Sequence, residues 1–456
     1  MRPRPDGAVR VAGGQGFYGD DPSGVADLLT EQPDYVCLEA LAELTLAILA
    51  KDRQRDEALG YTRDLPLYLM HLLPAVLAGG TKVITNAGGI NPLGALKLLQ
   101  ASAEQFGLSG LKVAVVLGDD ILGQPELLPQ DFPPPADLQF ANAYLGVAGI
   151  VEGLQQGADV VITGRVADAA LFLAPLVHEH GWALDTPDGP PMSQEDWDRL
   201  AAGTVVGHLL ECSGQSTGGN NAGEWWTTPD PWRYAFPLAD VTADGTAHVF
   251  TPEVAGGRCD FDTVRQQLLY EVGDPTSYLT PDVVVDMTSV RLTDLGEDRV
   301  RVDEVVGRAA TGSYKVVGAS RNGYAADASF AFGWPDAPAK ARSAARIARK
   351  RIAEAGIDLL DWHVELFGVD ALHGPAAPAD PDPAEVVLRL AWKTADADAA
   401  MRAARQIIPM ALSAPMPGLT PANRARPKPS SLLRIHTGLV DAAAVESGRR
   451  VVLETL

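Results

Sequence analysis

Short apolar runs alternate with longer mixed segments between residues 9 and 170. Each run is rich in Val, Ile and Leu, is too short for a helix and leads into a polar turn, which is typical of a buried parallel strand. The mixed segments have the length of helices, and glycine stands where several of them end. The predicted strands are Val9–Gly13, Tyr35–Leu38, Lys82–Thr85, Lys112–Leu117 and Asp159–Thr163. The predicted helices are Pro22–Thr30, Ala40–Lys51, Pro66–Ala78, Gly94–Gln105 and Ala141–Gln156.

This alternation predicts an α/β fold. Strands that are buried on both faces and separated by helices form a mostly parallel β-sheet with flanking helices, in a Rossmann-like, doubly wound arrangement. A (β/α) barrel begins with the same alternation, so it stays open as an alternative. A further helix is predicted at Glu195–Glu211, and we expect a first domain at residues 1–226 with a ligand site at its strand tips.

The pattern changes after residue 226. Apolar runs now come in pairs joined by short turns, and the Asn322-Gly323 dipeptide is a strong hairpin signal between two of them. We expect a C-terminal α+β lobe as a second domain at residues 227–456, with a sub-lobe from about residue 385. The predicted hairpins pair Val283–Arg291 with Arg299–Val306, across a turn at residues 295–298, and Tyr314–Ala319 with Ala325–Phe332. The predicted helices are Lys340–Ala355 and Asp396–Ile408, and two further strands are His363–Phe367 and Val386–Trp392.

Composition narrows the classes of function. Apolar residues make up 46% and charged residues 21% of the 456-residue chain, so we expect folded domains rather than disorder. The formal net charge of −22 repels phosphate backbones and anionic lipid, which argues against nucleic-acid and membrane partners. No run approaches the roughly 20 apolar residues of a membrane span, and the three cysteines are too scattered for a disulfide framework. We therefore expect a cytoplasmic protein.

Polar residues gather where the predicted strands end, and ligands bind beyond these ends in open α/β sheets. After the first strand, Gly14, Gln15 and Gly16 offer backbone amides to an anion at the next helix N-terminus. The spacing is not GxGxxG, and Asp20 and Asp21 would repel a phosphate, so a dinucleotide is disfavoured. The alternative role of these two aspartates is to cap the following helix.

The second strand leads into two glutamates. A helix that begins at Glu39 would place Glu39 and Glu43 on one face, because residues four apart are neighbours on a helix. Such a carboxylate pair can bind a metal or move a proton. The alternative is charge compensation at the start of a helix.

Amides follow the third strand. Asn91 precedes a proline and has the alternative role of a helix N-cap, whereas no such role explains Asn86. We therefore expect Asn86 in particular to contact a ligand. The substrate-binding candidates of this turn are Asn86, Gly88, Gly89 and Asn91.

The fourth and fifth strands end in Asp119 and Arg165. Arg165 is the best candidate for binding an anion, because a guanidinium grips a carboxylate or phosphate in a bidentate fork. Asp168, three residues further on, would orient it or act as a catalytic acid. The alternative is a buried structural ion pair.

The predicted helix at residues 195–211 ends in a polar loop. His208 and Glu211 are three residues apart, so they face the same side and form an acid/base candidate or half of a metal site. The alternative is an ordinary pair on the helix surface. The loop that follows is rich in hydrogen-bond donors and suits a ligand. Its substrate-binding candidates are Gln215, Thr217, Gly219 and Asn220.

Several motifs, in this order, together resemble the acyclic terpene utilisation AtuA-like family: GGQGFYGD from residue 13, TNAGGINP from 85, ITGRVAD from 162, GHLLEC from 207 and QSTGGN from 215. The resemblance is strong over residues 9–319 and continues more weakly to about residue 417. It implies a setting in the bacterial breakdown of branched terpenoid acids as coenzyme A thioesters. Longer members carry a Ser-Gly-Asp-Lys-Gly-Asp segment that this chain lacks, which implies a small companion subunit as a partner.

The leading hypothesis is a hydratase or dehydratase, a lyase acting on a small carboxylic acid or an acyl-CoA thioester. Elimination of water beside a carbonyl needs a base, an acid and an anion clamp. Glu39 or Glu43 would be the base, Asp168 or His208 the acid and Arg165 the clamp. The alternatives are an acyl-CoA thioester hydrolase or acyl transferase, and a non-catalytic scaffold. Carboxylates dominate these tips, so a divalent cation such as Mg²⁺ is a candidate cofactor, and we expect a homo-oligomer.

Overall fold

The computed structural model describes residues 1–186, 189–378, 381–413, 420–421 and 427–456. These residues form two compact units. The first contains residues 1–319 and 435–456, and the second contains residues 320–434. The change of sequence pattern after residue 226 therefore falls inside the first unit.

A ten-stranded sheet forms the centre of the first unit, in the order β11-β12-β8-β7-β1-β2-β3-β6-β4-β19. The five middle strands are parallel, as predicted, and the strands beside them are antiparallel. Because the order has two edges, the sheet is open and the barrel alternative is excluded. The middle strands are β1 Val9–Gln15, β2 Tyr35–Leu38, β3 Lys82–Thr85, β6 Val160–Thr163 and β4 Lys112–Leu117. The outer strands are β7 Leu238–Val241, β8 Ala247–Phe250, β11 Arg291–Gly296, β12 Arg299–Asp303 and β19 Arg450–Thr455.

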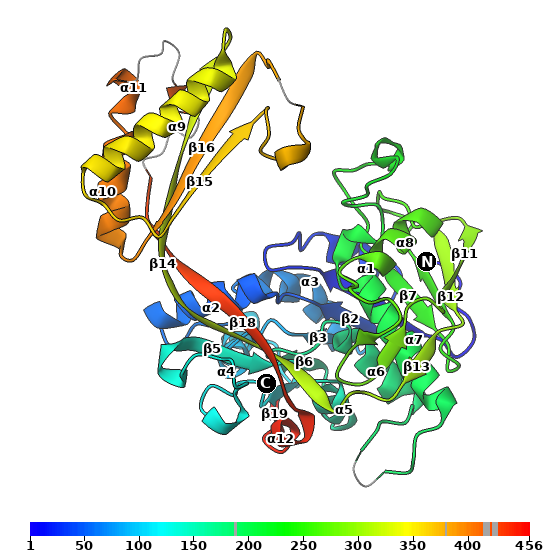
Figure 1. The fold of residues 1–456 in the computed structure, drawn as a ribbon. Helices are drawn as coiled ribbons and strands as arrows, with labels where there is room; N and C mark the ends of the chain where they lie inside the picture. The colour runs from blue at the N-terminus through cyan, green and yellow to red at the C-terminus, as the bar shows by residue number, and fades with distance from the viewer. Residues whose placement is uncertain (187–188, 379–380, 414–419, 422–426) are drawn as a thin grey trace. The chain divides into compact units, whose positions relative to one another are not determined.

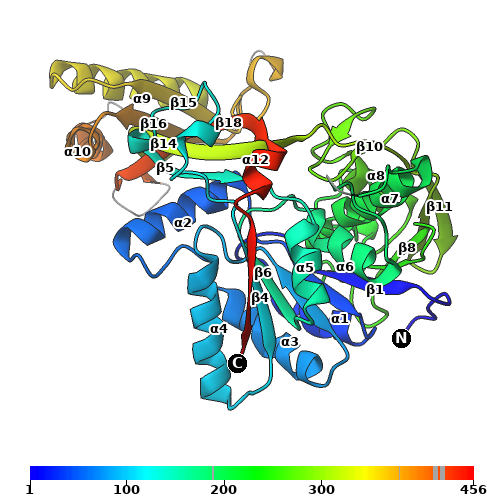
Figure 2. The ribbon, with the colours of Figure 1, turned by 90° about the horizontal axis from the view of Figure 1, so that it is seen from below.

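Helices cover both faces of this sheet (Figure 2). The first face packs through Val36 and Val83 against α1, α3 and α4, and the second packs through Val11 and Cys37 against α5, α6 and α7. The first set is α1 Gly24–Leu29, α3 Leu65–Leu77 and α4 Pro92–Phe106. The second set is α5 Ala148–Gln155, α6 Ala170–His180 and α7 Gln194–Leu210. The unit also contains α2 Glu43–Arg55, α8 Phe261–Leu269 and α12 Ala442–Glu446.

The connections that leave the parallel strands change face between β3 and β6. Strands β1, β2 and β3 lead to helices on the first face, whereas β4 and β6 lead to α5 and α6 on the second face. Since β3 and β6 are hydrogen-bonded neighbours, the chain leaves two adjacent strand ends in opposite directions. Such a topological switch point opens a crevice at the carboxyl ends of the strands. Asn86 follows β3, and Arg165 lies two residues after β6.

The second unit has the βαββαβ order of ferredoxin-like folds. Its strands are antiparallel in the order β15-β16-β14-β17, and α9 and α10 lie on one side of them (Figure 1). Phe330, Leu388 and Trp392 point to that side and form the core with the helices. The α+β character predicted for the C-terminal half is therefore confirmed. The elements are β14 Ser313–Gly333, which begins in the first unit, α9 Ala337–Glu354, β15 Asp361–Phe367, β16 Glu385–Thr394, α10 Ala397–Ile407, α11 Met410–Ser413, β17 Thr420–Pro421 and β18 Ser430–Asp441.

The hairpin predicted around Asn322-Gly323 is wrong. A single strand, β14, runs through both residues from Ser313 to Gly333. Gly323 has a φ of +80°, and a Cβ there would lie 2.4 Å from the carbonyl oxygen of Thr394 on β16. The glycine thus allows the neighbouring strand to approach closely, and no turn is needed to explain it.

Two other elements differ in part from the prediction. Residues 138–143 form strand β5 Leu138–Ala143, which pairs with β14, and the helix that was expected from Ala141 begins only at Ala148. The turn at Glu297-Asp298 does join β11 to β12, with φ values of 54° and 55°. Residues 284–286, which were predicted to belong to this hairpin, instead form a strand of a separate small sheet. That sheet consists of β9 Tyr278–Leu279, β10 Val284–Asp286 and β13 Val306–Arg308.

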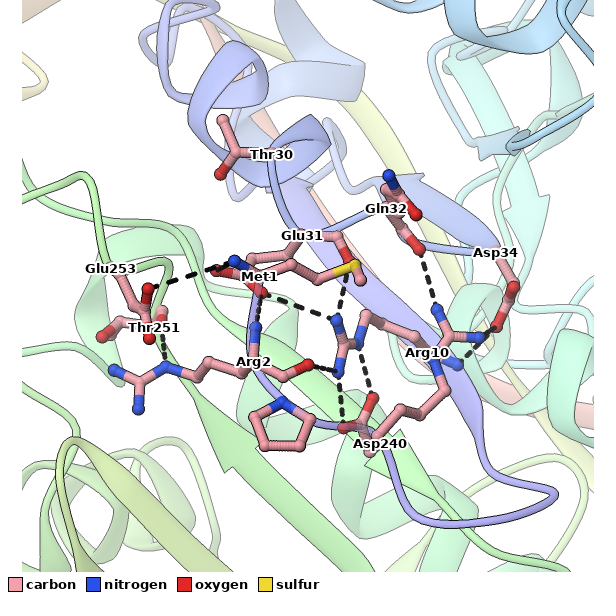
Figure 3. Close-up of polar contacts among 12 residues, drawn as sticks. Met1, Arg2, Arg10, Thr30, Glu31, Gln32, Asp34, Asp240, Thr251 and Glu253 are labelled. Atoms are coloured by element: carbon pink, nitrogen blue, oxygen red, sulfur yellow. Dashed lines mark hydrogen bonds and ion pairs between the residues drawn. The ribbon is translucent and has the colours of Figure 1, made fainter.

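A buried ion-pair network ties the start of the chain to β1 and β7 (Figure 3). Arg10 donates to both carboxylate oxygens of Asp240, at 2.7 and 2.8 Å, and its Nη1 donates to the carbonyl oxygen of Glu31 at 2.7 Å. The carboxylate of Glu31 accepts from the backbone N–H of Arg2 at 2.6 Å. Arg10, Glu31 and Asp240 are each about 1% exposed, so one guanidinium compensates two buried carboxylates.

Replacing Arg10 with methionine should lower the free energy of unfolding by about 3–5 kcal/mol, because Asp240 would remain as an uncompensated buried charge and Glu31 would keep only the N-terminal ammonium of Met1 as its ion-pair partner. Urea unfolding at neutral pH measures this loss. The double variant Arg10→Met, Asp240→Leu should lose less than Arg10→Met alone. A double variant that is less stable than the single variant would contradict this account.

Candidate functional site

Side chains that follow β3 and β6 form hydrogen bonds with the turn that follows β2. Asn86 accepts from the backbone N–H of Ala40 at 2.7 Å and donates to Glu39 Oε1 at 2.9 Å. The N–H of Leu41 donates to the same Glu39 oxygen at 2.8 Å, and Arg165 Nη1 donates to the carbonyl oxygen of Leu41 at 2.6 Å. Three adjacent strand tips are thereby linked at the switch point, and Asn86, Glu39 and Arg165 meet there as the sequence predicts.

The guanidinium of Arg165 is fully buried. Besides Leu41, it donates from Nε to the carbonyl oxygen of Val166 at 2.8 Å and from Nη2 to Asp168, and the ring of Tyr144 lies 4.2 Å from its centre. These contacts agree with the structural ion pair that the sequence left open as an alternative. The Asp168 side chain is 35% exposed, against 1% for Arg165, so Asp168 is the member of the pair that a ligand can reach.

The tip of β4 is joined to the same group. The buried carboxylate of Asp119 accepts from the backbone N–H of Arg165 at 2.7 Å and from Asn142 Nδ2 at 2.8 Å. Burial raises the pKa of Asp119 to about 6, although these hydrogen bonds partly oppose the effect. Asn142 was missed in the sequence because its segment was interpreted as the start of a helix, whereas it lies on β5.

Glu39 is the most strongly perturbed carboxyl group at these tips. Burial raises its pKa well above the ordinary range, and the negative charge of Asp168 raises it further. Arg165 and the hydrogen bond from Asn86 oppose the shift without cancelling it. The protein environment therefore favours the protonated form of Glu39.

His208 and Glu211 form the predicted pair at the end of α7. His208 Nδ1 lies 3.0 Å from Glu211 Oε1, and both side chains are buried. Burial raises the pKa of Glu211 to about 7, the contact with His208 opposes this, and the charge of Asp168 adds to it. Burial alone would lower the pKa of His208, but its contact with Glu211 raises the pKa overall.

One oxygen of this pair is without a partner. Glu211 Oε2 is buried and has no hydrogen-bond partner among the residues that the structure describes, whereas the His208 ring also interacts with the backbone of Leu268. Glycines of β1 let α7 come close enough to bring the pair to the strand tips. A Cβ on Gly13 would lie 2.2 Å from the Leu210 carbonyl oxygen, and one on Gly16 would lie 2.7 Å from the Cys212 backbone.

Glu43 is not part of this group. Helix α2 begins at Glu43, so Glu39 precedes the helix and the expectation that both carboxylates share one helix face is wrong. Glu43 Oε1 accepts from Lys315 Nζ at 2.8 Å and from the Tyr144 hydroxyl at 2.9 Å. Partial burial opposes ionisation, but these contacts lower the pKa of Glu43 to about 2. It therefore remains a carboxylate in a structural ion pair.

The amide groups at the glycine-rich tip of β1 form hydrogen bonds within the protein. The backbone N–H of Gly16 donates to Asp20 at 3.0 Å, and Gln15 Nε2 donates to Asp64 at 3.1 Å. A Cβ on Gly14 would lie 2.7 Å from the Val36 side chain, so that glycine permits close packing. The protein's own carboxylates thus occupy the positions that the sequence assigned to an anion.

The turn after β3 is also held by internal contacts. Asn91 caps α4 by accepting from the N–H of Gly94 at 3.0 Å, which is its alternative role, and its amide donates to the carbonyl oxygen of Leu59 at 2.9 Å. A Cβ on Gly88 or Gly89 would lie within 2.4 Å of neighbouring atoms, so both glycines allow close packing.

The loop after α7 borders open space. Gln215, Gly219 and Asn220 line two neighbouring cavities of about 330 and 230 Å³. Asn220 donates to Gln215 Oε1 at 3.2 Å. The hydroxyl of Thr217 instead donates to the Ala235 carbonyl oxygen at 2.5 Å and is buried. Three of the four predicted residues of this loop are therefore placed to meet a ligand.

A third cavity lies at the switch point. It has a volume of about 420 Å³, and its walls include Asn91, Asp119 and Asn142 together with Arg53 and Arg450. The two arginines were not identified from the sequence, since α2 and the last strand supply them from positions far apart in the chain. We call this space the switch-point cavity.

No group of three or more His, Cys, Asp and Glu side chains among the described residues is arranged to hold a metal ion. Among the residues that the structure describes, no helix is both long enough and apolar enough to cross a membrane.

The model of the acyclic terpene utilisation family protein AtuA matches residues 9–451. The chain belongs to this family. The resemblance recognised in the motifs is thus confirmed over nearly the whole length of the AtuA-like chain. No curated protein and no solved structure matches it.

In this AtuA family member, ionisation of Asp119 should cost stability. Its pKa rises from the ordinary 3.8 to about 6 in the folded chain, so the folded state binds the proton more tightly than the unfolded state. Stability should then fall as the pH rises from about 4 to about 6, by up to about 3 kcal/mol. Thermal unfolding at pH 4.5 and pH 8 should show that Asp119→Asn gains stability relative to the wild type only at pH 8.

The matched control is Asp137→Asn, which changes an exposed carboxylate that does not contribute to the shift. It should leave the difference between the two pH values unchanged. An equal effect of Asp119→Asn at both pH values would contradict the shift.

Proposed function

We propose that the chain acts in acyclic terpene utilisation, as its family description indicates, by adding or removing water beside the carbonyl group of a small carboxylic acid or acyl-CoA thioester. The observation that carries the proposal is the partnerless buried oxygen of this pair, Glu211 Oε2, beside His208. Buried polar atoms in folded proteins nearly always have a partner, so this position calls for a water molecule or a ligand hydroxyl. A hydroxyl is the group that such a reaction adds or removes.

The protonation states around this position support acid/base chemistry. The pKa of Glu211 rises to about 7, the pKa of Glu39 rises well above its ordinary range, and Asp168 is the ion-pair partner of Arg165. An acid and a base side by side, kept apart in pKa by their surroundings, are what elimination of water requires.

In the dehydration direction, Asp168 removes a proton from the carbon beside the carbonyl. The bond to the neighbouring hydroxyl breaks with its electron pair while the carbon–carbon double bond forms. The hydroxyl takes a proton from the His208–Glu211 pair and leaves as water. Hydration is the reverse, with the pair acting as base.

Glu39 has a different role from the one expected in the sequence. Burial favours its protonated form, which is unsuited to act as the base but can donate a hydrogen bond to the oxygen of the carbonyl as negative charge develops there. Asn86 and Leu41 both donate to Oε1, which leaves Oε2 to carry the proton. Arg165 acts as a positioning residue for Asp168, because its donors are used within the protein.

Glu211→Gln should lower kcat about 10²–10³-fold, since general acid/base groups typically contribute rate factors of this order. Dehydration in the unmodified chain should also slow as the pH rises above about 7, where the Glu211 proton is lost, and this limb should disappear in the variant. The assay follows gain or loss of one water by mass spectrometry with a panel of short 3-hydroxy and α,β-unsaturated acids and their coenzyme A thioesters.

Glu104→Gln, at an exposed carboxylate on α4, is the control and should retain full turnover. Release of free coenzyme A without gain or loss of water would replace the proposal with thioester hydrolysis or acyl transfer. Turnover that appears only when a small companion subunit is added would favour the scaffold role for the isolated chain.

A further inference from the structure

The switch-point cavity has positive charge on several sides. Arg53 on α2 and Arg450 on β19 both line it, and neither forms an ion pair with a carboxylate among the residues that the structure describes. Arg53 makes one hydrogen bond, from Nη1 to the Ile90 carbonyl oxygen at 2.8 Å, and keeps its other donors. In a chain with a net charge of −22, two such arginines at one cavity are a local exception.

A helix N-terminus adds to this charge. The 15-residue helix α4 begins at Pro92, and its first residues, Pro92 and Leu93, line the cavity. The N-terminal end of a helix carries partial positive charge and attracts anions. Asp119 and Asp120 also line the cavity and act in the opposite sense, but the carboxylate of Asp119 is already held by two N–H donors.

A partnerless acceptor gives the cavity a second kind of specificity. Asn142 is 1% exposed and lines the cavity, and its Oδ1 has no hydrogen-bond partner among the described residues. Its Nδ2 donates to Asp119, which fixes the orientation of the amide and leaves the oxygen as an acceptor. A buried acceptor of this kind is stabilised by a ligand O–H or N–H donor.

We infer that the switch-point cavity binds a small carboxylate that also carries a hydroxyl group, with Arg53 and Arg450 receiving the carboxylate and Asn142 Oδ1 accepting from the hydroxyl. This inference deepens the proposed function, on which its identification of the ligand as a hydroxy acid rests. Arg53 and Arg450, whose N–H donors are not all used within the protein, take the anion-binding role that was expected of Arg165. A cation is disfavoured because both arginines would repel it.

The test is calorimetric titration of the full chain with 3-hydroxybutanoate and with butanoate, which differ by one hydroxyl group. The unmodified chain should bind 3-hydroxybutanoate about tenfold more tightly, because only this acid satisfies the Asn142 acceptor. Arg53→Gln and Arg450→Gln should each weaken both acids about tenfold or more. Asn142→Leu should remove the difference between the two acids.

Arg346→Gln is the matched control, since Arg346 is an exposed arginine of α9 in the second unit. It should bind both acids as the unmodified chain does. Thermal unfolding of each variant establishes that it is folded, and Arg53→Lys replaces Arg53→Gln if the latter is not.

Three results would overturn the inference: no binding of either acid at millimolar concentration, equal binding in the arginine variants, or binding of Mg²⁺ without binding of the acids. Inorganic phosphate that binds as tightly as 3-hydroxybutanoate, with no effect of Asn142→Leu, would also overturn it, in favour of a simple anion site. Titration of Glu211→Gln separates the two proposals, because loss of turnover there should leave arginine-dependent binding intact.

Discussion

The strand tips of this protein are organised around one buried cation. Arg165 loses its hydration entirely, and such a charge is tolerated only when fixed dipoles and carboxylates replace the water. The carbonyl oxygens of Leu41 and Val166 and the carboxylate of Asp168 supply that replacement. Each comes from a loop with no regular structure of its own. The position of those loops is therefore set by the need to solvate the guanidinium.

The same cation explains why acids can gather at this edge of the sheet. The negative charge of Asp168 lies close enough to raise the pKa of both Glu39 and Glu211, so ionisation of all three groups would be costly. Arg165 stabilises one negative charge, on Asp168, while burial disfavours a negative charge on Glu39. Carboxyl groups in different electrostatic surroundings are therefore placed together in one small region.

The sequence was informative where local pattern decides structure. The parallel strands and the i, i+3 contact of His208 with Glu211 could be predicted because both depend on short-range periodicity. The Asn322-Gly323 hairpin failed because a glycine that admits a neighbouring strand has the same signature as one that makes a turn. The direction in which an arginine side chain points is still harder to predict from the sequence. Tertiary contacts decide whether a guanidinium points to a ligand or to backbone carbonyls. The sequence therefore predicts that Arg165 lies at the strand tips, but it does not predict that the N–H donors of Arg165 are used within the protein.

Arg53 and Arg450 are residues that the sequence could not identify as part of a site. They are nearly 400 residues apart and carry no motif, yet the antiparallel pairing of β19 with β4 brings the last strand to the tip where Asp119 lies. Asp119 then connects the two regions, since it accepts from the Arg165 backbone on one side and from Asn142 on the other. A ligand that engages Asn142 therefore acts on a carboxylate that also fixes the Arg165 turn. Through this single buried side chain, the lining of the switch-point cavity and the turn that leads to Asp168 form one connected edge of the sheet.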